Sequence, residues 1–219
     1  MFEILLFLFS VWLLNKSYKP IEEKLTVVTE KFATLEEHKK YYVIKNLLKA
    51  TYLCFLCIVT VTLFTPYLYY NTWPNTLLRS LASMYVSNDV VGLYKVTGLK
   101  TSTRLHHMTT LLFLIVSWTL DFQQSKMAKL LFLYTFASAL TFPVNAFLGL
   151  RHCYDEKELK DVCKIAYYTY GVVCVLNWIL QCVFFENNLW SYYALILFVV
   201  YDDIVLLRWL REKNNLLNA

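Results

Sequence analysis

The chain has 219 residues, of which 58% are hydrophobic and 17% charged, with four Gly, four Pro and a formal net charge of +5. This composition is too apolar and too poor in turn residues for a soluble globular domain of this length. The apolar runs are continuous and lack the alternation of membrane β-strands, so we predict an all-α, polytopic membrane protein. The positive charge is spread over the connections between these runs, and we expect no nucleic-acid partner.

Seven apolar stretches approach or reach the roughly 20 residues that a membrane-spanning helix needs. They predict about seven transmembrane helices, at 2–14, 47–66, 76–95, 105–122, 128–150, 164–185 and 189–209. The first stretch lacks the basic start and small-residue cleavage site of a signal peptide, so residues 1–15 are expected to form an N-terminal anchor helix. With seven spans, nearly all connecting Lys and Arg fall on one side, which the positive-inside rule makes cytosolic. The N-terminus is then expected to be lumenal and the C-terminus cytosolic.

Residues 16–46 form the connection between the first span and the rest of the chain. Apolar residues recur there at helical spacing, with charged residues between them: Ile21, Leu25, Val28, Phe32 and Leu35. The pattern predicts an amphipathic helix on the cytosolic membrane surface, and a short coiled coil with a partner is the alternative. Lys45 and Lys49 are counted with the cytosolic charges of this connection. Residues 47–219 are expected to form one transmembrane domain of six helices.

Polar and ionisable residues inside the predicted spans indicate a functional interior, because such groups are costly in a membrane. Counted back from the basic residue that follows each of them, Asp89, Asn145 and Asp202 lie about 9 Å below the cytosolic boundary, at about 1.5 Å per helical residue. His106 and His107 lie somewhat shallower. Four spans therefore place polar groups in one layer, which predicts a polar chamber open toward the cytosol.

Most of these residues also have a purely structural interpretation. Asp202 and Asp203 could pair with the arginines that follow them at the membrane interface. Asn145 could satisfy backbone groups freed by the nearby proline, and the histidine pair could lie at the interface without any chemistry. Asp89 has no basic residue within a helical turn, so we expect it to accept a hydrogen bond from one of the two histidines.

The segment 106–118 resembles the core of the TLC-domain family, which includes ceramide synthases and the translocating-chain-associating membrane protein. The matching pattern is a His-His pair, a Thr three positions later, and a Ser-aromatic pair seven and eight positions after that Thr: His106, His107, Thr110, Ser117 and Trp118. Upstream, 85–89 is similar to an aromatic-to-Asp segment of the family. Downstream, 141–145 followed by Arg151 is similar to a Pro-and-Asn segment of the branch without synthase activity. The resemblance covers roughly residues 40–212.

This resemblance implies a TLC-type domain of six helices ringed around a central cavity, with an additional N-terminal helix. In ceramide synthases the span after the histidines carries a His-Asp pair and further acids, whereas 132–140 of this chain has no His, Asp or Glu. The chain therefore resembles more closely the branch that lacks synthase activity. The residues expected to line the cavity are Asn88, Asp89, His106, His107, Thr110, Ser117, Trp118, Asn145, Asp202 and Asp203.

The resemblance and the polar layer together suggest a function in lipid biology. We expect a multi-pass protein of the endoplasmic reticulum or a related endomembrane that binds a lipid or acyl chain and influences membrane lipid composition. One alternative is a ceramide-synthase-like N-acyltransferase that uses acyl-CoA, with His106, His107 and Asp89 as its catalytic residues. Another is a membrane-protein chaperone or cargo receptor. We expect no metal and no cofactor beyond that acyl-CoA, and nothing in the sequence indicates an oligomer.

Overall fold

The computed structural model describes residues 2–218, apart from the side chain of residue 68. Within that range all regular secondary structure is helical, which confirms the all-α prediction. The helices are α1 (Phe2–Val28), α2 (Glu30–Ala33), α3 (Glu37–Tyr69), α4 (Asn75–Lys95), α5 (Thr101–Ser117), α6 (Lys126–Ala139), α7 (Phe142–Leu150), α8 (Lys160–Val183) and α9 (Trp190–Asn218).

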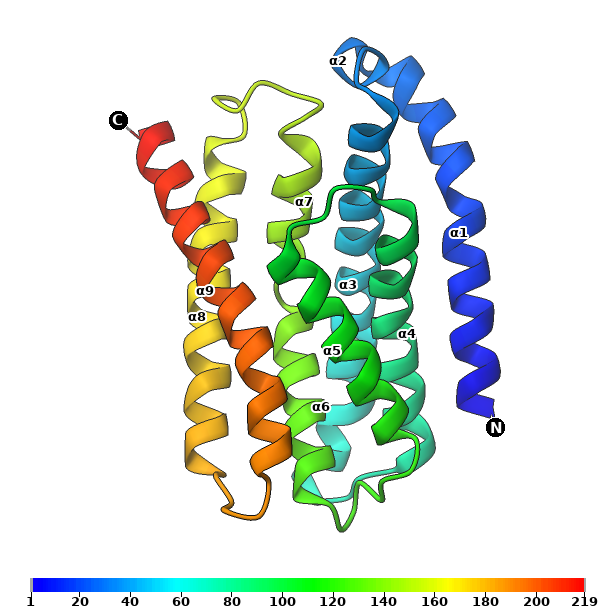
Figure 1. Ribbon diagram of the computed structural model, residues 1–219, viewed down its shortest axis with the longest axis vertical. Helices are drawn as coiled ribbons and strands as arrows, with labels where there is room; N and C mark the ends of the chain where they lie inside the picture. The colour runs from blue at the N-terminus through cyan, green and yellow to red at the C-terminus, as the bar shows by residue number, and fades with distance from the viewer. Residues whose placement is uncertain (1, 219) are drawn as a thin grey trace.

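The long helices run side by side along the longest axis of the molecule (Figure 1). The helices α6 and α7 form one rod with a bend of 45°, and α2 is a single turn. With α6 and α7 taken as one rod, the described chain runs along this axis seven times. The two marked chain ends consequently lie at opposite ends of the molecule (Figure 1).

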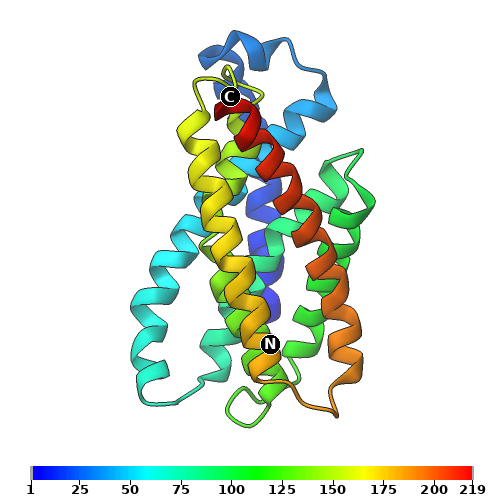
Figure 2. The same ribbon diagram turned by 90° about the vertical axis from the view of Figure 1, so that its left-hand side faces the viewer.

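Six of the rods form a closed ring, and α1 lies outside it. Contacts lead from α3 to α4, α5, α9 and α8, then to the bent α6–α7 rod and back to α3. The helix α1 packs mainly against the outer side of α4 (Figures 1 and 2). The helices α7 and α3 pack closely, since a Cβ atom added to Gly149 would lie 2.8 Å from the Leu47 side chain and 3.3 Å from the Val43 backbone oxygen. A glycine at this position lets the two helices pack almost backbone to backbone.

Two of the described helices are by length and composition able to cross a membrane: residues Glu37–Tyr67 of α3, and α8. The α6–α7 rod adds a third if both parts belong to one span. These three helices correspond to the predicted stretches 47–66, 164–185 and 128–150. The other four predicted spans do not qualify individually; α5, for example, has only 17 residues.

Residues 16–46 do not form a separate helix. The helix α1 continues to Val28 without a break at residue 15, and α3 begins at Glu37, well before the expected boundary at 46. Between them, the Thr29 side chain caps α2 by accepting a hydrogen bond from the Phe32 backbone N–H at 3.2 Å. Phe32 is fully buried in a cluster with residues of α1, α3 and α4. Part of the apolar repeat is thus used for packing within the chain.

One end of the bundle, here called the closed end, carries the loops 70–74 and 118–125 (Figure 1). Its core is aromatic: the Phe64 ring lies edge-on to Trp73 and Phe132, at centroid distances of 5.4 and 4.6 Å. Hydrogen bonds join the two loops across this core. The Asn75 side chain accepts from the Phe122 backbone N–H at 2.7 Å and donates to the Asp121 carboxylate at 3.0 Å. Apolar burial and hydrogen bonding together stabilise the packing at this end.

Candidate functional site

A cavity of about 300 Å³, here called the chamber, lies inside the ring and is lined by all six rods. Residues of the 96–100 connection and Arg151 lie at its border, so it is found toward the end opposite the closed end. Its wall combines apolar side chains with many polar and charged ones, among them Lys45, Lys49, His106, His107, Asn145, Arg151, Asp202 and Asp203. Ligand pockets in proteins measure roughly 300–1,000 Å³, so the chamber has the size of a small binding site.

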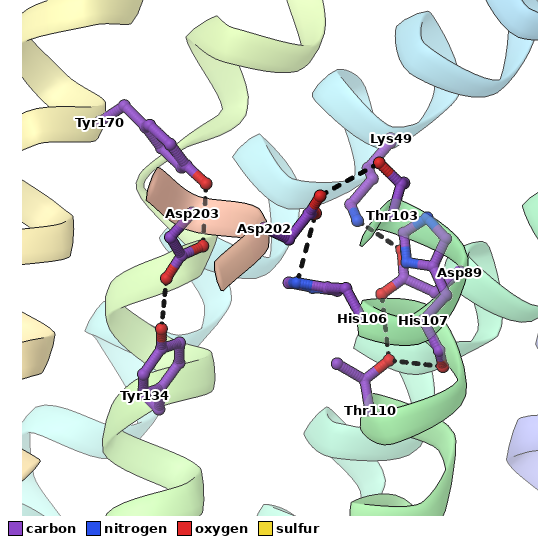
Figure 3. Close-up of polar contacts among 10 residues, drawn as sticks. All are labelled: Lys49, Asp89, Thr103, His106, His107, Thr110, Tyr134, Tyr170, Asp202 and Asp203. Atoms are coloured by element: carbon purple, nitrogen blue, oxygen red, sulfur yellow. Dashed lines mark hydrogen bonds and ion pairs between the residues drawn. The ribbon is translucent and has the colours of Figure 1, made fainter. Parts of the chain in front are cut away.

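Asp89 is the most deeply buried acid of the site, with no exposed surface. Its Oδ1 atom accepts an ion-paired hydrogen bond from the Lys49 ammonium and lies 3.2 Å from His107 Nδ1 (Figure 3). The Thr110 hydroxyl lies 3.5 Å from Oδ2 and donates to the His107 carbonyl oxygen at 2.9 Å. Side chains from α3 and α5 thus surround the carboxylate of α4, and these partners offset the cost of burying its charge.

The lysine partner of Asp89 comes from α3, where the sequence had indicated a cytosolic connection. Because α3 begins at Glu37, both Lys45 and Lys49 lie within the helix, and they are only 4% and 7% exposed. They are four residues apart, so they share one helix face, and that face is turned toward the chamber. The assignment of these two lysines to the cytosolic loop charge was therefore wrong.

Asp202 and Asp203 are neighbours on α9 but contact different helices. Asp202 accepts a hydrogen bond from the Thr103 hydroxyl at 3.2 Å and lies 3.6 Å from His106 Nδ1. Successive helical residues point about 100° apart, so the next carboxylate faces away (Figure 3).

Asp203 is held by two tyrosine hydroxyls. Tyr134 of α6 and Tyr170 of α8 both donate to its carboxylate, the latter at 2.8 Å (Figure 3). Within residues 2–218, neither Asp202 nor Asp203 makes the ion pair with a following arginine that the sequence had left open. The two aspartates therefore tie α9 to three other helices of the ring.

A second, smaller cavity of about 60 Å³ adjoins the chamber and is here called the apolar pocket. Its wall is largely apolar and includes Phe113, Leu114, Phe132, Ile196 and Val199. Three residues, Tyr85, His106 and Ser138, line both cavities. A polar space and an apolar space therefore meet at His106.

The structure separates the remaining predicted cavity residues into two groups. Asn145 lines the chamber, and Thr110 and Ser117 line the apolar pocket. Asn88, Asp89 and Trp118 line neither of these cavities, and Asp89 reaches the chamber only through its partners Lys49 and His107, which do line it. Asn88 is buried, and within residues 2–218 its Oδ1 atom has no hydrogen-bond partner.

Trp118 has a structural position at the junction of α1 with the ring. Its indole N–H donates to the Ser83 hydroxyl at 3.1 Å, and its ring lies edge-on to Phe7 of α1 at a centroid distance of 5.8 Å. The expectation that Trp118 lines the cavity is not met, because the indole turns toward α4 and α1.

Asp89, His106 and His107 also have the donor types of a metal site. Each offers one ligand atom, and these atoms lie within 4.8 Å of one another. The Lys49 ammonium already occupies Asp89 Oδ1, and its positive charge opposes a divalent cation there. These residues fit a metal poorly. His107 Nδ1 faces Asp89 Oδ1 at 3.2 Å, whereas within the described residues its Nε2 atom has no hydrogen-bond partner.

Sequence reasoning overlooked several residues of the site: Lys45, Lys49, Thr103, Tyr134, Arg151 and Tyr170 as direct partners or lining groups. For the two lysines a signal was present, since a four-residue spacing next to an apolar run predicts one helix face. No comparable signal marks the tyrosines, which reach Asp203 from two other helices.

Comparison of the chain with protein-family models, with curated proteins and with solved structures found no match. The chemistry of the chamber and of the apolar pocket is therefore the basis for assigning a function.

Proposed function

We propose that this protein is a TLC-type membrane protein of the endoplasmic reticulum or a related endomembrane. In this proposal it binds a lipid or acyl chain inside its ring of helices and thereby influences membrane lipid composition. The resemblance of segment 106–118 motivates the family, and the ring of six rods with an outer first helix is compatible with it.

The observation that carries the proposal is the junction between the chamber and the apolar pocket. A lipid has a polar head and an apolar chain, and each needs a matching environment. The chamber supplies charged and hydrogen-bonding groups, while the adjoining pocket supplies aromatic and branched aliphatic side chains. His106 lines both, so it would lie where the head of the ligand meets its chain.

Mass spectrometry of lipid retained by the purified full chain tests this proposal. Ala82 lines the apolar pocket, and Ala82→Phe would fill that space with a ring. The variant is expected to lose most of the retained lipid while it stays folded. The matched control is Leu197→Phe, because Leu197 is 66% exposed on α9 and lines neither cavity. Equal lipid retention by both variants, or no specific lipid in the unaltered protein, would contradict lipid binding in the pocket.

The proposal includes seven membrane crossings, with the N-terminus lumenal and the C-terminus cytosolic. It is supported by the seven passes along one axis and by the side on which the connecting Lys and Arg gather. Reporter tags at the two ends should then be found on opposite sides of the membrane. Detection of both tags on one side would contradict seven crossings but would leave the lipid-binding hypothesis unaffected.

A second function, N-acyl transfer from acyl-CoA to a sphingoid base, is favoured by one specific observation. Both histidines at the chamber have a carboxylate neighbour, at 3.2 Å for His107 and 3.6 Å for His106. A carboxylate beside an imidazole orients the ring and stabilises its protonated form. His106 or His107 would accept the amine proton as the C–N bond forms and would return it to the thiolate released when the C–S bond breaks.

Incubation of purified protein with acyl-CoA and a sphingoid base separates the two functions. A transferase would form N-acylated product, and His106→Ala and His107→Ala would each reduce its rate by about 10² or more. Asp89→Asn would act through His107 and would be non-additive with His107→Ala. Lipid retention without any product would favour the binding function.

A further inference from the structure

Lys45 of α3 is a buried lysine that makes no hydrogen bond or close ion pair with the described residues. The residue is 4% exposed and lines the chamber. Among the described residues, no hydrogen bond or ion pair is made by its ammonium. A buried charge is costly unless it is paired, so an isolated ammonium at the wall of a cavity indicates that an anion completes the site.

Lys45 feels the charge of Asp89 and Asp202, but the carboxylates around the chamber have closer partners of their own. Asp89 is held by Lys49 and His107, and Asp203 by two tyrosine hydroxyls. Asp202 is in contact with Thr103 and His106. Among the described residues, the carboxylates therefore have hydrogen-bonding partners, whereas the Lys45 ammonium has none.

Arg151 brings a second cation to the border of the chamber. Its guanidinium lies over the Trp209 ring, 4.5 Å from the ring centroid. Within residues 2–218 its Nε atom is buried without a hydrogen-bond partner, and the residue makes no ion pair. Burial and neighbouring Arg151 lower the pKa of the adjacent His152, which keeps that imidazole neutral at physiological pH. Arg151, and not His152, therefore carries positive charge here.

The N-terminus of α5 adds backbone donors to the same chamber. Lys100, Ser102 and Thr103 of its first turn line the cavity, and no side chain caps this helix start within the described residues. The first N–H groups of a helix have no partner inside the helix and attract anions, which is why helix starts commonly bind phosphate.

We propose that the chamber binds a phosphate group, held by Lys45, Arg151 and the N-terminus of α5. The inference rests on the proposed function and sharpens it: the head of the bound amphiphile is an anionic phosphate ester. Lys45 supplies a point charge, the Arg151 guanidinium supplies parallel donors that fit phosphate oxygens, and α5 supplies backbone N–H groups. The phosphate could belong to a membrane lipid or to a water-soluble acyl carrier.

Gly92 of α4 positions the lysine. A Cβ atom added at Gly92 would lie 3.1 Å from Lys45 Cε and 3.4 Å from Cγ. The lysine stem therefore packs directly over the glycine, and any side chain there would displace it. This contact offers a way to move the ammonium without removing it.

The test uses the purified full chain, delipidated in detergent, and three probes: dioctanoyl phosphatidic acid, dioctanoylglycerol and inorganic pyrophosphate. Binding is measured by native mass spectrometry and by thermal shift. Lys45→Met and Arg151→Met are each expected to weaken phosphatidic acid binding by about tenfold, the loss expected for one charge-assisted hydrogen bond. Dioctanoylglycerol binding should be unchanged by either variant. Lys19→Met is the matched control, since Lys19 is exposed on α1 and loses the same charge.

The probes distinguish the sources of the phosphate. A Lys45-dependent response to phosphatidic acid but not to pyrophosphate identifies a lipid headgroup, and the reverse identifies a water-soluble phosphate ester. If the Lys45→Met variant does not fold, phosphatidic acid binding is measured on the Arg151→Met and Gly92→Ala variants instead. Phosphatidic acid binding that none of these variants weakens more than Lys19→Met overturns the phosphate site. That result would leave the lipid-binding function standing. If the unaltered protein binds neither phosphatidic acid nor dioctanoylglycerol, the proposed function fails as well.

Discussion

The two ends of the bundle are built on different principles. The closed end has an aromatic core in which Phe64 and Phe122 are almost completely buried, and its two loops are joined by hydrogen bonds. The other end contains the chamber, where charged groups replace apolar packing and about 300 Å³ is left open. Apolar burial stabilises a fold, whereas buried ion pairs contribute little net stability and position chemical groups. The closed end therefore supports the fold, and the chamber end is free to bind.

Phe64→Ala should cause the largest loss of stability. The ring is fully buried between Trp73 and Phe132, so its removal leaves a cavity and should cost about 4 kcal/mol of unfolding free energy. Chemical unfolding in detergent measures this loss. Phe55→Ala is the control, because Phe55 on the same helix is 52% exposed. Similar losses in both variants would show that Phe64 does not anchor the closed end.

Lys49→Met should destabilise the chamber end in a way that a second substitution reverses. Removal of the lysine leaves the Asp89 carboxylate buried without its main partner, at a cost of about 3 kcal/mol. Adding Asp89→Asn removes the unpaired charge and should recover more than half of that loss. No comparable rescue is expected for Phe64→Ala, because a cavity has no charge to neutralise. Strict additivity of the two substitutions would contradict the ion pair.

Asn75→Ala should weaken the attachment of loop 118–125 to the start of α4 at the closed end. The variant loses the hydrogen bonds to Phe122 and Asp121, which together are worth about 2 kcal/mol. The control is Thr76→Ala at the exposed neighbouring position, which also places an alanine in the first turn of α4. Thermal unfolding should register the loss, while ligand binding in the chamber stays the same. A binding defect in Asn75→Ala would show that the two ends are coupled.

The smallest expected effect is a loss of stability of the closed end at acidic pH. Hydrogen bonds from Asn75 and from the Gln123 backbone N–H lower the pKa of Asp121 below its ordinary value. A carboxyl group with a lowered folded-state pKa stabilises the protein above its unfolded pKa of about 3.9, and the contribution is lost as pH falls through the folded value. Asp121→Asn should flatten this part of the melting-temperature profile. An identical profile in the variant would assign the acid sensitivity to other groups.

Much of the helical framework could be predicted because continuous apolar runs specify helices wherever they pack. The first residues of the helices were harder to predict, because lysines beside an apolar run resemble the end of a membrane span. In α3 the helix extends ten residues earlier than the predicted span, from Glu37 instead of residue 47, and this extension brings Lys45 and Lys49 into the chamber. A charged residue on an otherwise apolar helix can face an interior as well as a membrane surface.

The sequence predicted which polar residues lie close together, but not which of them form pairs. Depth follows from the constant rise along a helix, and it placed Asp89 near the histidines, where His107 is found. Pairing depends on the rotation of each helix about its axis, which an apolar helix sequence does not encode clearly. For that reason the tyrosine partners of Asp203, on α6 and α8, could not be identified from the sequence.

The contact between Arg151 and Trp209 gives the protein an optical reporter of its own. Trp209 lines the chamber, and its ring lies under a guanidinium that a bound anion would draw away or partly neutralise. Indole emission responds to nearby charge, so occupancy of the chamber should change the intrinsic fluorescence of this tryptophan. The other tryptophans line neither cavity, and Trp209→Phe would isolate the signal against their constant background. Binding could then be followed continuously without an attached dye.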